Sequence, residues 1–190
     1  EDASALARVR HSPSEYIAMI ERAQRHIEAG DVYQVCLTNE ITIEGARDPL
    51  AVFLRLRQSN PAPYSAFIKL AERALVSSSP EQFIRVSNDG LVSSKPIKGT
   101  RPRGENAHQD AAIAAELQQD KKERAENLMI VDLLRNDLSR VAQAGSVKVE
   151  RPFAVESYPT VHQMVTTVRA RLIEGKGPLD MIRALFPCGS

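Results

Sequence analysis

The sequence predicts an α+β protein in which antiparallel sheets are layered with outer helices. Segments whose apolar residues recur at every second position indicate strands, and segments whose apolar residues recur at every third or fourth position indicate helices. The strand segments mostly follow one another through short turns and do not alternate one by one with helices, which favours antiparallel pairing. No repeat or internal linker interrupts the 190 residues, so a single domain, or a large piece of one, is expected.

Composition limits the classes of function. The 25 Lys and Arg residues nearly balance the 24 Asp and Glu residues, and a net charge of +1 creates no global field for nucleic acid or an anionic membrane. No apolar run approaches the roughly 20 residues of a membrane-spanning helix, and the first residues lack a signal-peptide pattern. The two cysteines are far apart and suit a reducing compartment. We therefore expect a cytoplasmic protein without nucleic-acid or membrane partners.

The first helix is predicted from its capping signals. Ser12 and Glu15 have the spacing of a capping box, with Pro13 at the first helical position. Isoleucines then recur at helical spacing until Gly30, which ends the pattern. These signals predict a helix from Pro13 to just before Gly30.

The next segment changes from helical to strand periodicity. From residue 31 to residue 44, apolar and polar residues alternate, which predicts one long strand whose polar face includes Gln34. A second helix is predicted to begin at Asp48-Pro49 and to end before Asn60-Pro61, because the residue before a proline disfavours the α conformation.

The remaining elements are predicted from the same two periodicities. Strands are expected at residues 64–70, 74–78, 83–87 and 91–94, the last pair joined by a turn at Asn88-Asp89-Gly90. Residues 99–107 are rich in Arg, Pro and Gly and are expected to be irregular. Two helices hinged near Asp120 are expected within residues 109–141, then strands at 147–155 and 161–172, and a last helix after Gly175.

One lysine stands in the segment Pro96-Ile97-Lys98-Gly99-Thr100, which is expected to be a short loop that closes a β-hairpin. Lys98 is then either a solvated loop charge or a nucleophile. Taken alone, the loop position favours the solvated charge. The segments around it change that balance.

Five other segments accompany this loop. They are Ser79 to Phe83, Arg101 to Gly104, Glu123 to Asp132, Arg135 to Asp137 and Phe186 to Ser190. Together they resemble the chorismate-utilising enzymes, and most closely the branch of aminodeoxychorismate synthase component I. The resemblance implies the chorismate-binding fold of anthranilate synthase component I, incomplete at the C-terminus. Residues 1–190 would then be the N-terminal part of the catalytic domain, without the rest of that domain and without a preceding N-terminal domain.

The resemblance also implies a reaction. The branch converts chorismate and ammonia to 4-amino-4-deoxychorismate for para-aminobenzoate and folate synthesis, with ammonia supplied by a glutamine amidotransferase subunit or domain. Lys98 would add at C2 of chorismate as the C4 hydroxyl leaves, and ammonia would then attack C4 and expel the lysine. Anthranilate synthases carry alanine at this position, so Lys98 favours the aminodeoxychorismate branch.

Two further catalytic residues are implied. Glu81 matches a general acid that protonates the leaving hydroxyl at C4. His162 matches a histidine close to the same hydroxyl, although a single histidine in a strand is more often a packed, hydrogen-bonded side chain.

Four residues are implied to bind the substrate. Gly99 and Thr100 match residues that approach it, glycine because the backbone must come close without a Cβ atom. Ser190 closes the Phe-Pro-x-Gly-Ser motif. Gln34 stands where isochorismate and salicylate synthases carry a lysine that activates water. Since glutamine is no base at neutral pH, water is not the expected nucleophile.

The magnesium prediction depends on two glutamates. Glu123 and Glu126 are three residues apart on a predicted helix, which places their Cβ atoms about 5–6 Å apart on one face. They could form a solvated acidic edge paired with Lys121 and Lys122. Alternatively, they hold Mg²⁺, which takes one or two carboxylates and keeps several waters. The resemblance implies that Glu126 ligates Mg²⁺, that Glu123 supports it through water, and that the metal binds a substrate carboxylate.

Two alternatives stay open. One alternative is anthranilate synthase component I, which only the Lys98 position separates from the favoured prediction. The other is a non-catalytic chorismate-binding or partner-docking module that keeps the fold. The resemblance further implies that substrate-carboxylate ligands and a second acidic pair follow Ser190. We therefore expect this chain by itself to bind chorismate and Mg²⁺ weakly and to turn over little.

Overall fold

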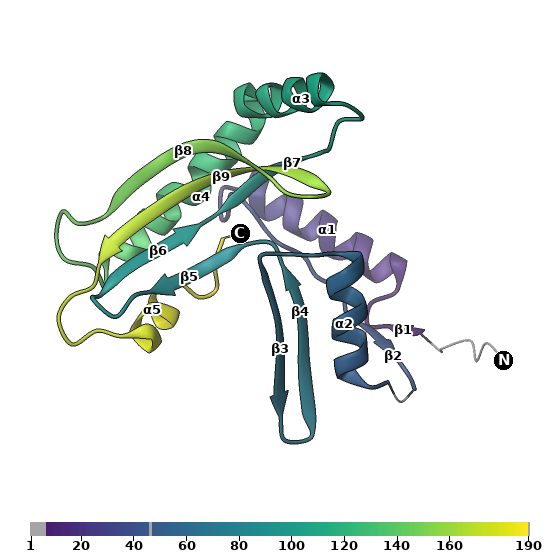
Figure 1. The fold of residues 1–190 in the computed structure, drawn as a ribbon. Helices are drawn as coiled ribbons and strands as arrows, with labels where there is room; N and C mark the ends of the chain where they lie inside the picture. The colour runs from purple at the N-terminus through teal and green to yellow at the C-terminus, as the bar shows by residue number, and fades with distance from the viewer. Residues whose placement is uncertain (1–6, 46, 190) are drawn as a thin grey trace. The chain divides into compact units, whose positions relative to one another are not determined.

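The computed structural model describes residues 7–45 and 47–189 of the chain (Figure 1). Internal contacts divide the chain into two units, Glu1–Val52 and Phe53–Ser190. All but one of the described site residues predicted from the sequence belong to the second unit. That unit contains the large sheet and the helices that pack on it.

The first unit confirms the predicted first helix with its capping box, and the second predicted helix, also confirmed, begins within this unit. Helix α1 (Pro13–Glu28) begins at Ser12, whose side chain accepts from the backbone N–H of Glu15, while the Glu15 side chain accepts from the backbone N–H of Ser12 at 2.8 Å. Strand β1 (Ala7–Val9) pairs antiparallel with β2 (Ile41–Ile43). Helix α2 (Pro49–Ser59) begins at the end of this unit.

The long strand predicted for residues 31–44 is wrong except at its end. Only Ile41–Ile43 is a strand, because the only pairing partner within the described residues is the three-residue β1. Residues 31–40, including Gln34, are irregular, and the side chains of Tyr33 and Val35 are 52% and 40% exposed. Alternation shows which side chains would share one face of a strand. A strand also needs a neighbouring strand as the partner for its backbone hydrogen bonds.

The second unit confirms the antiparallel layering. Strands β3 (Tyr64–Leu70) and β4 (Arg73–Ser79) form a hairpin. A five-stranded sheet contains β5 (Gln82–Val86), β6 (Leu91–Lys95), β7 (Ile97–Pro102), β8 (Lys148–Ser157) and β9 (Val161–Arg171). Strand β9 lies at the centre, with β6 and β7 along one edge and β8 along the other (Figure 1).

Three helices complete the unit: α3 (Ala107–Gln119), α4 (Lys121–Ser139) and α5 (Pro178–Leu185). The predicted hinge is confirmed, because Asp120 ends α3 and also caps α4 by accepting from the backbone N–H groups of Lys122 and Glu123. Those backbone hydrogen bonds hold the pKa of Asp120 below its usual value. In the part of the chain that the structure describes, no helix is long and apolar enough to cross a membrane.

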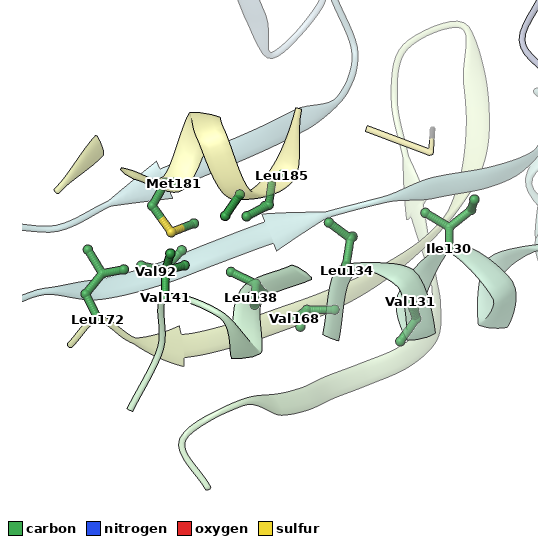
Figure 2. Close-up of a cluster of buried hydrophobic side chains, with 11 residues drawn as sticks. Val92, Ile130, Val131, Leu134, Leu138, Val141, Val168, Leu172, Met181 and Leu185 are labelled. Carbon is green, nitrogen blue, oxygen red and sulfur yellow. The ribbon is translucent and has the colours of Figure 1, made fainter. Parts of the chain in front are cut away.

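A hydrophobic core fixes α4 and α5 against one face of the sheet. Figure 2 shows its side chains from α4 and α5 meeting those from β6 and β9. The cluster consists of Val92, Ile130, Val131, Leu134, Leu138, Val141, Val168, Leu172, Met181, Ala184 and Leu185. Close packing of this kind leaves α4 little freedom to shift. The polar residues at the start of α4 are thereby held at a defined place over the sheet.

The irregular loop predicted for residues 99–107 is also partly wrong. Residues Ile97–Pro102 form β7, so Lys98 lies in a strand and not in a hairpin loop. Between Ile97 and Thr100 the chain takes three steps where β9 takes two, from Val165 to Gln163. This extra residue is a β-bulge, which explains why a strand tolerates glycine here.

We predict that Gly99→Ala destabilises the protein more than Gly90→Ala. Both glycines have positive φ, +83° and +79°. A Cβ atom at Gly99 would lie 3.0 Å from Glu123 and Leu117 atoms, whereas one at Gly90 would meet nothing within 4 Å. Both variants share the cost of the left-handed backbone, about 1–2 kcal/mol, and Gly99→Ala adds about 1–3 kcal/mol of overpacking.

Urea unfolding of the two variants measures the difference. Equal losses in the free energy of unfolding would show that Gly99 is needed only for its backbone angle.

Candidate active site

The bulge in β7 brings Gly99, the residue after Lys98, against helix α4. A Cβ atom built on Gly99 lies 3.0 Å from a carboxylate oxygen of Glu123, which is on α4. Pro96, two residues before Lys98, lines a cavity together with Ile130 of α4. The backbone on both sides of Lys98 therefore lies close to this helix. Lys98 is half-buried and does not extend as a fully solvated charge.

Glu81 contacts the residue that precedes Lys98. It stands between β4 and β5, and its Oε1 atom accepts a hydrogen bond from the backbone N–H of Ile97 at 3.1 Å. This contact holds a half-buried carboxylate one residue away from Lys98 along the strand. Glu81 also lines a cavity of about 150 Å³. The other residues that line it are Ser79, Phe83, Ser94, Pro96, Ile130, Leu134, Cys188 and Gly189.

The two glutamates predicted to hold a metal differ in their surroundings. The side chain of Glu123 is 15% exposed, and its Oε1 atom pairs with Nη1 of Arg101 at 3.2 Å. Arg101 also pairs with Asp120 at 3.0 Å. The side chain of Glu126 is 45% exposed and lies 3.7 Å from Nζ of Lys122. The i,i+3 placement on α4 is confirmed.

The donor set is compatible with magnesium. Within residues 7–45 and 47–189, no three side chains of His, Cys, Asp or Glu gather as a metal cage. Mg²⁺ does not require one, since it is held by one or two carboxylates together with waters and substrate oxygens. Glu126 is the more exposed of the two and is 3.7 Å from Lys122, whereas Glu123 is 15% exposed and is paired with Arg101 at 3.2 Å.

His162 is held on both sides of its ring. It is 1% exposed on β9, opposite Arg101 of β7. Its Nδ1 atom lies 2.8 Å from Oγ of Ser157, and its Nε2 atom lies 2.8 Å from Oδ1 of Asp110. Asp110 is in turn paired with Arg103 at 2.6 Å.

Sequence reasoning did not find Asp110 and Ser157. Asp110 stands 52 positions before His162, on a different element, so no local spacing connects them. Ser157 is nearer in sequence, but only the antiparallel register that pairs it with His162 across the β8–β9 turn brings them together. The short turn between the two predicted strands could have indicated that Ser157 lies beside His162. No comparable sequence pattern indicates the contact with Asp110.

A second buried polar pair lies at the middle of α4. Asn127 is fully buried, and its Oδ1 atom accepts a hydrogen bond from Oγ1 of Thr166 on β9 at 2.5 Å. Thr166 also accepts from the backbone N–H of Phe153 at 3.0 Å. The pair fastens α4 to the sheet one residue beyond Glu126.

The other substrate-binding predictions are only partly placed. Thr100 is exposed on β7, and its carbonyl oxygen accepts from Arg101 at 3.1 Å. Gln34 belongs to the first unit, on an irregular exposed segment, and Ser190 lies outside the described residues. The structure therefore brings Glu81 and Glu123 to the two residues that flank Lys98, Ile97 and Gly99, and it pairs His162 with Arg101 of the same strand.

Comparisons with known proteins agree with the motifs. The chain is 50% identical over 181 residues to an aminodeoxychorismate synthase from Streptomyces pristinaespiralis, covering 95% of this chain and 25% of that protein. It is 45% identical to aminodeoxychorismate synthase component 1 from Escherichia coli, covering 93% of this chain and 39% of that protein. It is 43% identical to anthranilate synthase component 1 from Thermus thermophilus, covering 92% of this chain and 38% of that protein. The chain thus spans between a quarter and two fifths of these relatives.

Solved structures share the fold. Anthranilate synthase component I from Streptococcus pneumoniae superposes with a TM-score of 0.81 at 30% identity, covering 95% of this chain and 39% of that chain. A putative isochorismate synthase from Bacillus anthracis, at 20% identity, shares the fold with a TM-score of 0.76 over 97% of this chain and 51% of that chain. The model of the chorismate binding enzymes matches residues 2–190. The chain therefore belongs to the chorismate binding enzyme family.

Proposed function

We propose that this chain is the amine-bearing part of an aminodeoxychorismate synthase, which converts chorismate and ammonia to 4-amino-4-deoxychorismate. The observation that carries the proposal is the placement of Lys98 in the bulge of β7. Glu81 is bonded to the residue before it and Glu123 packs against the residue after it. The identities with synthases of this name support the same assignment.

The arrangement suits nucleophilic catalysis by an amine. The neutral amine of Lys98 forms a bond to C2 of chorismate, the ring double bonds shift, and the C4–O bond breaks. Glu81 donates a proton to the departing hydroxyl, which leaves as water. Ammonia then attacks C4, the double bonds shift back, and the lysine amine leaves from C2. The product carries an amine at the carbon that carried the hydroxyl.

Mg²⁺ is the proposed cofactor. Glu126 would hold it directly, and Glu123 would support it through water. When bound, the ion neutralises and fixes a carboxylate of the substrate. The half-exposed position of Glu126, one helical turn from Glu123, supports this assignment.

The proposed partner is a glutamine amidotransferase subunit or domain that supplies ammonia. The name "component 1" of the Escherichia coli relative implies a second component there. The product would serve para-aminobenzoate and folate synthesis. A cytoplasmic location stays a prediction, and the Arabidopsis relative is named as chloroplastic.

Two other functions remain to be separated from this one. Anthranilate synthase is supported by the Thermus relative and would give anthranilate and pyruvate from the same substrates. A non-catalytic binding module would give no product. Product analysis with chorismate and ammonium, performed on the longest native protein that contains this chain, decides among the three.

We predict that Lys98→Ala lowers the amination rate by at least about 10³-fold, because it removes the nucleophile. Lys148→Ala, at an exposed position on β8, is the matched control and should leave the rate unchanged. Intact-mass analysis during turnover should detect an adduct of chorismate minus water on the Lys98 protein and none on the alanine variant. Undiminished amination by Lys98→Ala would exclude covalent catalysis.

We predict that Glu126→Gln weakens Mg²⁺ dependence. Loss of one negative oxygen donor should raise the Mg²⁺ concentration for half-maximal activity by roughly 10- to 100-fold. Glu116→Gln, at an exposed position on α3, provides the control. The assay is amination against free Mg²⁺ concentration after chelation, and an unchanged titration for Glu126→Gln would remove this residue from the metal site.

A further inference from the structure

A series of hydrogen bonds connects Arg103, Asp110, His162 and Ser157 in that order. We propose that Asp110 is the positioning residue of His162: it holds the ring with the proton on Nε2, so that His162 exchanges protons only through the hydroxyl of Ser157. The fixed ring follows from the geometry alone. Its catalytic consequence rests on the proposed function.

The first step concerns the donors around Asp110. Its Oδ1 atom accepts from Nε of Arg103 at 2.8 Å and from the backbone N–H of Gly104 at 2.8 Å, and Nε2 of His162 lies 2.8 Å from the same oxygen. Its Oδ2 atom accepts from Nη2 of Arg103 at 2.6 Å. The paired guanidinium holds the pKa of Asp110 well below its usual value, so the carboxylate is ionised at neutral pH. An ionised carboxylate can only accept, and Nε2 must therefore carry a proton.

The second step concerns the opposite nitrogen. A neutral imidazole carries one N–H group, so a proton on Nε2 leaves Nδ1 as an acceptor. Ser157 must then donate its hydroxyl proton to Nδ1 across the 2.8 Å contact. Ser157 is exposed whereas His162 is 1% exposed. The hydroxyl of Ser157 is consequently the group through which the buried ring meets its surroundings.

The third step concerns Arg103, which holds the carboxylate of Asp110 in one orientation. Its two bonds to Asp110 fix both carboxylate oxygens, and its Nη1 atom donates to the carbonyl oxygen of Tyr158 at 2.6 Å. One guanidinium thus fastens α3 to the end of β8 that carries Ser157. The other nearby cation, Arg101, is engaged by Asp120 and Glu123.

The consequence for the proposed reaction is a defined proton path. When the oxygen of Ser157 receives a proton from outside this series of residues, its hydroxyl proton moves to Nδ1 and an imidazolium forms. Asp110 stabilises that imidazolium through Nε2–H, as a carboxylate does when it orients a catalytic histidine. The reverse transfer returns the proton, so no group is consumed.

The test is the tautomer of His162, measured by ¹⁵N NMR of the histidine side chains in this chain. The proposal expects the Nε2–H form in the native protein. Asp110→Ala should displace it, because Nε2–H then loses the oxygen that accepts from it at 2.8 Å. The proton can then move to Nδ1, where the oxygen of Ser157 can accept from it.

Two further variants keep the test decisive. Asp137→Ala removes a comparable ion pair, Asp137 with Arg140, and should leave the His162 signals unchanged. Ser157→Ala should keep the Nε2–H form and shift only Nδ1. A native Nδ1–H form, or an Nε2–H form that persists in a folded Asp110→Ala protein, would overturn the proposal. If Asp110→Ala does not fold, the native spectrum and Ser157→Ala decide.

The catalytic part is tested by amination in the longest native protein that contains this chain. Asp110→Ala and Ser157→Ala should each lower kcat by about 10²-fold, the lower end of what a positioned acid–base group contributes, with little change in KM for chorismate. Unchanged kcat in either variant would reject the proton path. Absence of amination in the unmodified protein would reject the proposed function and leave the tautomer result standing.

Discussion

The site depends on the pairing of β7 with β9, and on the one extra residue that β7 carries there. Three steps on β7 match two on β9 between Ile97 and Thr100. The bulge contains Lys98 and Gly99, and it brings the backbone of Gly99 close to the carboxylate of Glu123. On the other side of Lys98 along the chain, the backbone N–H of Ile97 donates to Glu81. Both neighbours of Lys98 in the sequence are therefore in contact with, or close to, a glutamate.

Helix α4 contributes side chains both to the hydrophobic core and to the candidate site. Its buried residues, from Ile130 to Leu138, pack in the core against β6, β9 and α5. Its first turn carries Glu123, and Glu126 follows one turn later. The apolar part fixes the helix on the sheet, and Asn127 adds a hydrogen bond to Thr166 beside the glutamates. The position of the carboxylates is therefore set by packing and not by flexible loops, which suits the binding of the charged substrate proposed above.

Local signals predicted much of this structure, and non-local pairing explains the rest. The capping box at Ser12 involves residues three positions apart, so the sequence alone indicates it, and helix propensity indicates the hinge near Asp120. The strand predicted for residues 31–44 failed because no partner for residues 31–40 exists among the described residues. Strand β7 was missed because Gly99 and Pro102 suggested a loop, and only the register with β9 shows the bulge. The contact of Asp110 with His162 joins residues whose proximity no periodicity reveals.

Asp120 is at once the last boundary of α3 and the N-cap of α4. Only Asp120 separates the two helices, so the chain changes direction between them within one residue. Asp110 lies in the first turn of α3 and Glu123 in the first turn of α4. The contact with His162 and the close approach to Gly99 are therefore carried by two helices that share one capping residue. Loss of that cap would reach both contacts through the backbone alone.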